Sequence, residues 1–464
     1  MVRALCGLVL AALVACGGGR KEAVHTTSEQ PPVLVIAVDG LEWDVLLPLL
    51  HAGRLPALAA LMERGTAGLL ETIEPTLSPV VWTSIATGKR PEQHGILGFA
   101  KPPATPDGKP ALYSNLDRRT KAVWNVASEW QKRVGVVGWW MTYPADPVRG
   151  VLVAQTNTTD QLDIAKGRKI WKGGLVSGVP GQVFPPERQA AALATLDRVD
   201  RELPALTASI FGRFQHPHSA LGTNLWSNCQ WSFRADETYL RIALDLLALE
   251  RFDLFLLYLG GPDVVGHRFW RYRDPALYRY PPEPGEVADF HNVIDDYYLW
   301  IDRAVGQLVA AAGPRARVVI VSDHGMRPVN LDKRFDPDDP PVDVTSAHHL
   351  DGPPGVIIAA GTDIRHEPLP RTIRDLQRAD LRTRASVLDV APTLLELLDV
   401  PVGADFAGHV AESLIEPAFL AAHPVRTVPT HDTPEWLEQH RRLAGADPGD
   451  EERIRQLRAL GYVQ

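Results

Sequence analysis

Short runs of branched apolar residues alternate in this chain with longer segments of helical periodicity, and this alternation most constrains the fold. Each run is long enough for one buried strand, and each intervening segment is long enough for a helix that crosses back over a sheet. The pattern predicts an α/β fold with a mostly parallel sheet sandwiched by helices. The predicted strands are Val33–Val38, Val134–Val137, Val151–Val153, Leu254–Leu259, Val318–Val321 and Val356–Ala359. The predicted helices are Asp44–Arg64, Val80–Thr87, Thr120–Lys132, Asp236–Leu249, Val287–Ala312 and Val387–Leu398.

The first residues have the composition of a secretion signal. An apolar run too short to span a membrane ends in "LVAC", Leu13 to Cys16, which resembles the bacterial lipobox. We therefore expect residues 1–16 to be a lipoprotein signal, Cys16 to carry lipid, and residues 17–32 to be a tether. The protein would then be an extracytoplasmic, membrane-anchored bacterial lipoprotein. A plain signal peptide or an uncleaved anchor remains the alternative.

The rest of the chain is predicted to form one catalytic domain with additions. Residues 33–425 would be the domain, with a weakly periodic, Gly- and Pro-rich insertion or cap at about 155–232. Residues 426–464 would be a polar, partly helical extension. Cys229 would be the single mature cysteine of this domain, and no histidine lies near it, so we expect a buried structural thiol. The formal net charge of -8 gives no basic patch, so no nucleic-acid polymer is expected as a partner.

Carboxylates and imidazoles follow several predicted strands. In open α/β sheets ligands bind beyond the carboxyl ends of strands, so these residues should lie close together. Each alone has a simpler interpretation: Asp39 could cap a helix, and Asp-His-Gly is a common turn. Together, imidazole and carboxylate ligands suit zinc better than calcium or magnesium, and their number suffices for two ions. The candidates are Asp39, Asp263, His267, Asp323, His324, His348 and His349.

Ser78 is the candidate nucleophile. It precedes Pro79 at the predicted start of a helix, so its hydroxyl could equally be a helix cap. The same position would present a hydroxyl and free backbone N–H groups to a phosphate, and a nearby metal ion would activate that hydroxyl. Local sequence leaves both interpretations open.

Together these motifs resemble the type I phosphodiesterase and nucleotide pyrophosphatase branch of the alkaline phosphatase superfamily, over roughly Pro32 to Val410. In that branch the nucleophile, usually Thr, stands ten residues before the Gly of "TG" and is followed by "HGI"; here Ser78 stands ten residues before Gly88, with "QHGILGF" after it. Thr76 is the fallback if the register differs. The resemblance assigns one metal to Asp39, Ser78, Asp323 and His324, and the other to Asp263, His267 and His348, with His349 competing for the place of His348.

The resemblance implies an alkaline-phosphatase-like core and a two-zinc phosphoester hydrolase in which Ser78 forms a covalent phospho-enzyme. The substrate would be a small phosphoester, either a nucleotide or a lipid head group. A sulfatase is excluded because Val80 and Trp82 stand where its motif needs Pro and Arg. A phosphoryl transferase or mutase, and a lipid-anchored binding protein without activity, remain alternatives. The aromatic residues Trp139, Trp140 and Tyr143 could line a substrate pocket or belong to the core.

Overall fold

The computed structural model describes residues 30–101, 111–163, 168–212, 220–336 and 344–445. Cys16, the predicted signal and most of the predicted tether lie outside these ranges. A nine-stranded sheet runs through the molecule in the order β15-β2-β14-β11-β1-β10-β5-β6-β9, and five of its eight pairings are parallel. Its strands are β1 (Val33–Val38), β2 (Gly65–Glu71), β5 (Val134–Val137), β6 (Gly150–Val153), β9 (Val183–Phe184), β10 (Leu254–Leu259), β11 (Arg317–Val321), β14 (Gly355–Ala360) and β15 (Thr383–Ser386).

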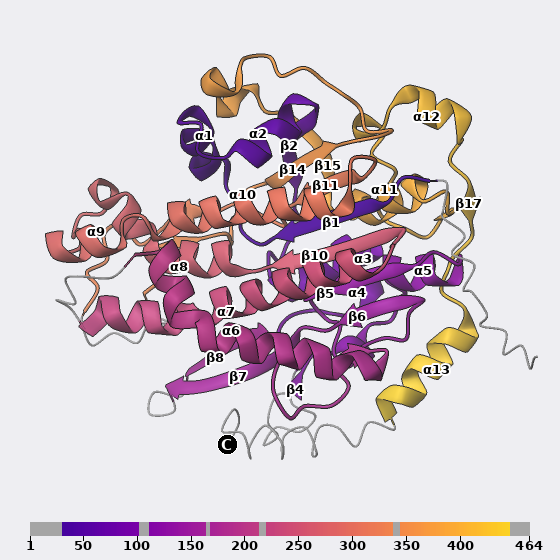
Figure 1. Ribbon diagram of the computed structural model, residues 1–464, viewed down its shortest axis with the longest axis horizontal. Helices are drawn as coiled ribbons and strands as arrows, with labels where there is room; N and C mark the ends of the chain where they lie inside the picture. Colours follow the sequence, from indigo (N-terminus) through magenta and orange to yellow (C-terminus); the bar gives the residue numbers. More distant parts are fainter. Residues whose placement is uncertain (1–29, 102–110, 164–167, 213–219, 337–343, 446–464) are drawn as a thin grey trace, which may run out of the picture.

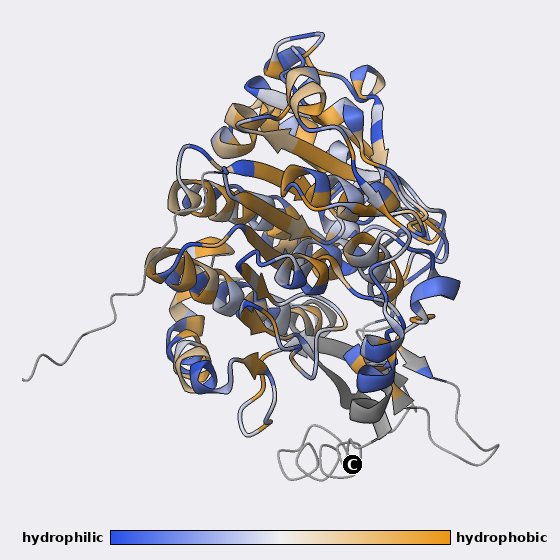
Figure 2. Cartoon of the chain, turned by 90° about the vertical axis from the view of Figure 1, so that its right-hand side faces the viewer, coloured by the Kyte–Doolittle hydropathy of each residue, from blue (hydrophilic) through white to orange (hydrophobic). Residues whose placement is uncertain are grey.

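Helices cover both faces of the sheet (Figure 1). One face packs against α1 (Trp43–His51), α2 (Pro56–Glu63), α7 (Ala220–Leu249), α8 (Gly261–Arg273) and α10 (Val293–Ala312), and the other against α3 (Ser78–Thr87), α5 (Val123–Glu129) and α11 (Val390–Leu397). The side chains of β1 alternate between the two cores, as the period of a strand requires: Leu34 and Ile36 enter the first, and Val33 and Val35 the second. Figure 2 shows the same strands as the hydrophobic interior of the molecule. The predicted fold class is confirmed.

Two predicted helices are each divided in the structure. The segment predicted as one helix from Asp44 to Arg64 forms α1 and α2, because Gly53 has a left-handed φ of 69° and Pro56 starts the second helix. The segment from Val287 to Ala312 is divided into α9 (Pro284–Phe290) and α10. The strands β2 and β15 were not predicted, since neither contains a run of branched apolar residues.

The region between β6 and β10 adds a hairpin, the edge strand β9 and two helices to the central sheet. A hairpin of β7 (Thr156–Asp163) and β8 (Arg168–Gly174) is followed by β9, by α6 (Gln189–Ile210) and by the long helix α7. Helix α7 runs from residue 220 to residue 249, across the predicted cap boundary at 232. It buries Cys229, which is 1% exposed, as expected for a structural thiol.

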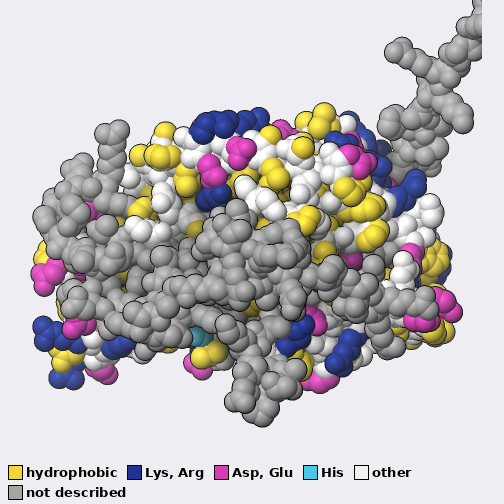
Figure 3. Space-filling model, turned by 90° about the horizontal axis from the view of Figure 1, so that it is seen from below, with side chains coloured by type: hydrophobic (Ala, Val, Ile, Leu, Met, Phe, Trp, Pro, Cys, Tyr) yellow, Lys and Arg dark blue, Asp and Glu magenta, His cyan; other side chains and the backbone are white. Residues whose placement is uncertain are grey.

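Near the other end of the chain, α12 (Pro417–Ala422) and α13 (Pro434–Gly445) lie on the outside of the domain, and residues 446–464 fall outside the described ranges. On the face seen from below, the described Lys, Arg, Asp and Glu side chains are interspersed (Figure 3). Among the described helices none is by itself long and apolar enough to cross a membrane, although α1 and α2, bent by 95°, pass that test as a pair.

Candidate active site

Three neighbouring parallel strands deliver the carboxylates of the site to one edge of the sheet. Strand β1 lies between β10 and β11, with Val38 opposite Leu259. Asp39 and Asp323 follow the ends of β1 and β11 closely, and Asp263 lies in the first turn of α8, just beyond β10.

Gly40 permits the close approach of two of these segments. Its φ is +68°, and a Cβ atom there would lie 2.8 Å from the Cα atom of Asp263. A side chain at this position would therefore be strained and would push the carboxylates of Asp39 and Asp263 apart.

The residues form two overlapping groups. In the first, His324 Nε2 lies 3.4 Å from Asp39 Oδ1 and 3.2 Å from Asp323 Oδ2. The second contains Asp263, His324 and His349, and in each group one ligand atom per residue lies within 4.8 Å of the others. The rings of His324 and His349 are stacked, with centroids 3.7 Å apart. His324 thus belongs to both groups.

Helix α8 places a further imidazole beside Asp263 of the second group. Asp263 and His267 are four residues apart on one face of α8, as the sequence predicted. Their Oδ1 and Nε2 atoms lie 3.2 Å apart, and His349 Nε2 approaches the same oxygen at 3.7 Å.

Four candidate ligand atoms are buried and have no hydrogen-bond partner among the described residues. They are Asp39 Oδ1, Asp263 Oδ1, Asp323 Oδ2 and His324 Nε2. Buried polar atoms without partners are costly, so four of them facing one another fit a bound cation.

The electrostatics of the three carboxylates support this interpretation. Burial, together with the charge of Asp263, raises the pKa of Asp39, and burial with the charges of Asp39 and Asp263 raises the pKa of Asp323 well above its usual value. Burial also acts to raise the pKa of Asp263, but the adjacent His267 lowers it overall. Carboxylates that repel one another in a buried site fit divalent cations, which would offset their charge.

Backbone carbonyls fix the tautomers of two imidazoles. His267 Nδ1 lies 2.8 Å from the carbonyl oxygen of Ala347, and His324 Nδ1 lies 3.0 Å from that of Gly325. Because a carbonyl only accepts, each Nδ1 carries a proton, and in the neutral ring each Nε2 keeps its lone pair for a metal.

His348 differs from these histidines. Its Nδ1 accepts hydrogen bonds from the backbone N–H groups of His349 and Leu350, at 2.7 and 2.9 Å, so Nε2 carries the proton in the neutral ring. His348 and His267 both lie outside the two groups, but His267 Nε2 lies 3.2 Å from Asp263 Oδ1. His349 is inside one group and is only 7% exposed. The structure thus groups His349 with Asp263, whereas from the sequence His348 was the preferred ligand and His349 the alternative.

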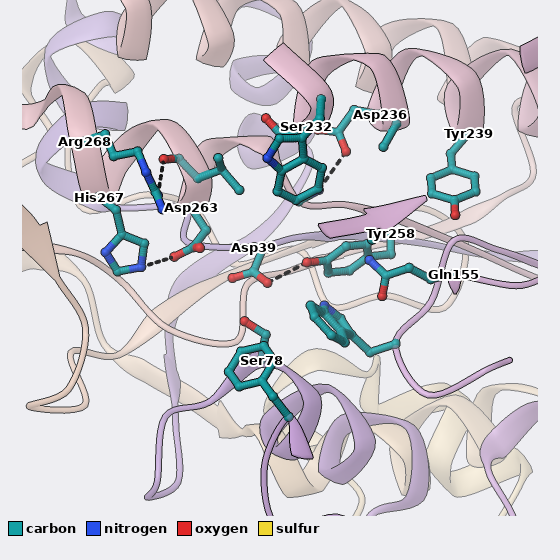
Figure 4. A pocket seen from close by; sticks show the side chains of 17 residues that line it. Asp39, Ser78, Gln155, Ser232, Asp236, Tyr239, Tyr258, Asp263, His267 and Arg268 are labelled. Atoms are coloured by element: carbon teal, nitrogen blue, oxygen red, sulfur yellow. Dashed lines mark hydrogen bonds and ion pairs between the residues drawn. The ribbon is translucent and has the colours of Figure 1, made fainter. Parts of the chain in front are cut away.

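The hydroxyl of Ser78 is not used as a helix cap. Helix α3 begins at Ser78 itself, Leu77 occupies the cap position, and no side chain caps the helix. Ser78 lines the same cavity as Asp39 and Asp263 (Figure 4). Thr76, by contrast, donates its hydroxyl to the carbonyl of His349 at 2.9 Å and is 1% exposed, so it is engaged in holding that loop.

Sequence reasoning missed residues that support the site. Glu42 caps α1 through Asp44 N and also accepts from the backbone of Met326, so it joins the loops after β1 and β11. Tyr258 and Trp82 both donate to Asp39. From the sequence, Trp82 had no role at the site and was notable only for standing where the motif of a sulfatase needs arginine.

The type I phosphodiesterase / nucleotide pyrophosphatase family model matches residues 33–409. The chain belongs to this family. The match runs from β1 past α11 and so includes every residue of the two groups.

Individual relatives of this family member are distant. Two 2,3-bisphosphoglycerate-independent phosphoglycerate mutases, from Synechococcus sp. strains JA-2-3B'a(2-13) and JA-3-3Ab, are 25% identical over 177 residues, which is 38% of this chain and 26% of theirs. The chain thus matches about a quarter of the length of these curated relatives. Phosphonoacetate hydrolase from Sinorhizobium meliloti 1021 is similar in structure with a TM-score of 0.36 and 21% identity, over 64% of this chain and 57% of that one. Human ectonucleotide pyrophosphatase / phosphodiesterase 5 has a TM-score of 0.45 and 15% identity, over 82% and 99%.

The "HGI" segment of this family member serves the structure of the site. His94, at the end of α4 (Pro91–His94), accepts at Nδ1 from Ile96 N at 3.1 Å, and its Nε2 lies 2.9 Å from Ser84 Oγ. It thereby ties the turn after α4 to α3.

The cavity extends from the carboxylates toward α7. Its volume is about 200 Å³, and Figure 4 shows Asp39, Ser78 and Asp263 at one end and Asp236 and Tyr239 toward the other. Aromatic side chains, Phe99, Trp140, Trp231 and Tyr258, form much of its wall. Of the aromatic residues left open by the sequence, Trp140 thus lines the cavity, whereas Trp139 is fully buried in the core.

Proposed function

We propose that this protein is a metal-dependent phosphoester hydrolase with two divalent cations, zinc being the best fit to a mixed carboxylate and imidazole set. The observation that carries the proposal is the convergence of four buried ligand atoms that have no hydrogen-bond partner among the described residues, beside a cavity that Ser78 lines. Asp39, Asp323 and His324, with Ser78, would hold one cation. Asp263, His267 and His349 would hold the other. The cations would supply Lewis-acid stabilisation of charge on the phosphoryl group.

Ser78 would be the nucleophile. Its position at the first residue of α3 places its hydroxyl where the helix N-terminus favours the charge of a phosphate. Its oxygen would bond to phosphorus as the bond to the leaving oxygen breaks; the serine proton would pass to solvent, and the leaving oxygen would take a proton from water. Water would then cleave the phospho-serine, releasing phosphate or a phosphomonoester and restoring the hydroxyl.

We propose a small phosphoester as the substrate. A cavity of about 200 Å³ is smaller than the roughly 300–1,000 Å³ typical of sites for drug-sized ligands. Arg268, half-buried on α8, lines the cavity and adds a positive charge at its side. These features favour a compact anionic molecule over a long lipid.

Transfer to an alcohol instead of water is the second candidate function. It is favoured by the partial similarity to the phosphoglycerate mutases, since a mutase returns the phosphoryl group to a hydroxyl. The same serine and cations would serve both reactions.

The deciding experiment compares a chromogenic phosphate monoester with a chromogenic phosphate diester, using zinc-loaded wild type, Ser78→Ala and Thr76→Val. We expect Ser78→Ala to lower kcat by about 10³-fold or more and Thr76→Val to keep measurable turnover. Ser128→Ala, which removes a hydroxyl on α5, is the matched control. If Ser78→Ala retains full activity, the nucleophile is wrong; if zinc-loaded wild type cleaves neither ester but transfers phosphoryl groups to alcohols, the mutase-like function replaces hydrolysis.

We also propose that the protein is lipid-anchored through Cys16 outside the cytoplasm, as the N-terminal sequence suggests. Expression of the full chain and of Cys16→Ser with a labelled fatty acid tests this. Label in the membrane fraction for wild type alone would support the anchor, and equal labelling would contradict it.

A further inference from the structure

The two oxygens of the Asp39 carboxylate have different surroundings. Oδ2 accepts a hydrogen bond from Trp82 Nε1 at 3.0 Å and another from the Tyr258 hydroxyl at 2.6 Å. Oδ1 has no hydrogen-bond partner and faces His324 Nε2 at 3.4 Å. The protein therefore supplies two hydrogen bonds to Oδ2, whereas Oδ1 is directed into the candidate metal site.

The two donors come from different elements and support each other. Trp82 lies one helical turn after Ser78 on α3, and Tyr258 lies on β10, opposite Ala37 of β1. Their rings meet edge to face with centroids 5.1 Å apart. Trp82 is 0% exposed and Tyr258 is 4% exposed, so neither side chain has room to turn away.

A third aromatic residue holds the pair from behind. Trp139 donates its Nε1 to the carbonyl of Trp82 at 3.2 Å and packs edge-on against its ring with centroids 5.2 Å apart. The chain of contacts from Trp139 through Trp82 to Asp39 joins the loop after β5 to the end of β1.

We propose that Trp82 and Tyr258 are positioning residues that hold Asp39 as a ligand through the single oxygen Oδ1. The inference rests on the proposed metal site. A carboxylate whose second oxygen accepts two hydrogen bonds cannot rotate to bind a cation with both oxygens. Single-oxygen ligation suits four-coordinate zinc, whereas larger cations such as calcium commonly take both oxygens of a carboxylate.

A purely structural role makes a different prediction. If the two donors only satisfied a buried carboxylate, removing one would lower stability and leave metal affinity unchanged. Trp300 offers the matched control, because its Nε1 donates to Glu237 Oε2 at 3.2 Å, and both residues are buried between α10 and α7. Trp300→Phe therefore removes the same type of hydrogen bond at a carboxylate outside both ligand groups.

The experiment measures zinc and calcium affinities of the metal-free full chain by competition with a chromogenic chelator, for wild type, Trp82→Phe, Tyr258→Phe and Trp300→Phe, with thermal unfolding alongside. We expect Trp82→Phe and Tyr258→Phe each to weaken zinc binding about 10–100-fold and to narrow the preference for zinc over calcium. Trp300→Phe should lower only the unfolding temperature. Tyr258→Phe keeps the ring and so reports even if Trp82→Phe fails to fold.

Two results would overturn the inference in different ways. Zinc binding by wild type that is unchanged in Tyr258→Phe would remove the positioning role and leave the proposed function intact. Failure of wild type itself to bind zinc would remove the proposed metal site and the inference with it.

Discussion

The adjacent histidines His348 and His349 differ in which ring nitrogen is free, and this difference assigns their roles. The Nδ1 atom of His348 accepts hydrogen bonds from two backbone N–H groups, so its lone pair is not available to a metal in the site. The Nε2 atom of His349 lies 3.7 Å from Asp263 Oδ1. A metal ligand must offer a lone pair, so His349 is the better candidate.

The first prediction follows from this assignment. His349→Ala should reduce bound zinc from two ions to one per chain, because the second group loses a ligand, whereas His348→Ala should still bind two. Elemental analysis of dialysed protein measures the ratio. Two ions in His349→Ala and one in His348→Ala would restore the assignment expected from the sequence.

A second prediction concerns His94 and the pH dependence of stability. Burial and the charge of Arg118 lower the pKa of His94 to about 3, so the ring stays neutral in the fold while the unfolded chain takes up a proton below about pH 6.5. Its contribution to stability is therefore present above pH 6.5 and is lost as the pH falls toward 3. His94→Gln should be less stable than wild type at pH 7, and the difference should shrink by ~2–3 kcal/mol at pH 4.5.

Urea unfolding of the metal-free proteins at the two pH values gives this difference directly, because other titrating groups are common to both. A gap between wild type and His94→Gln that stays constant with pH would contradict the neutral, buried ring.

At the scale of elements, helix α8 is positioned by a neighbour. Asp236 on α7 accepts from the backbone N–H groups of Gly260 and Gly261, at 2.8 and 2.9 Å, and so caps the helix that carries Asp263. On the same face of the sheet, Asp302 on α10 caps α2 in the same way.

The third prediction compares these two caps. Asp236→Ala and Asp302→Ala should each cost about 1–2 kcal/mol of unfolding free energy. Of the two variants, only Asp236→Ala should weaken zinc binding, by about tenfold, because α8 carries candidate ligands and α2 carries none. Zinc titration and chemical unfolding of both variants test this, and equal zinc affinities would show that α8 is held by other contacts.

The strands that carry the site were predictable because each is a run of branched residues ending in a polar group. Periodicity located β1, β10 and β11, and the parallel arrangement brought Asp39, Asp263 and Asp323 together. Bonds between residues distant in sequence were not predictable: the cap of α8 depends on a side chain from α7, and the choice between the two adjacent histidines depends on the path of their loop. The strand β2 was missed because its apolar residues are interrupted by glycine and its pairing is set by the tertiary structure.

At the scale of the whole molecule, the candidate site is a concentration of negative charge inside a large apolar core. The carboxylates of Asp39 and Asp323 are at most 1% exposed, and the charge of Asp263 acts on both of them. Without cations the repulsion between these buried carboxylates lowers the stability of the fold. The same carboxylates would provide the binding energy for cations. Sites of this type exchange stability for function.

The last prediction is therefore that Asp323→Asn is more stable than wild type without metal and less stable than wild type with zinc. Burial and neighbouring charges raise the pKa of Asp323, so the metal-free fold loses stability as the pH rises through that value. At pH 8, metal-free Asp323→Asn should be more stable than metal-free wild type by about 1–2 kcal/mol, because the variant removes a buried carboxylate that is repelled by Asp39 and Asp263. With zinc at a hundred times its dissociation constant, wild type should gain about 2.7 kcal/mol and the variant much less, because it has lost a ligand. Thermal unfolding with chelator and with zinc measures both differences. Lower stability of Asp323→Asn in chelator would mean that the three carboxylates do not repel one another in the fold, and the electrostatic argument for a cation site would lose its basis.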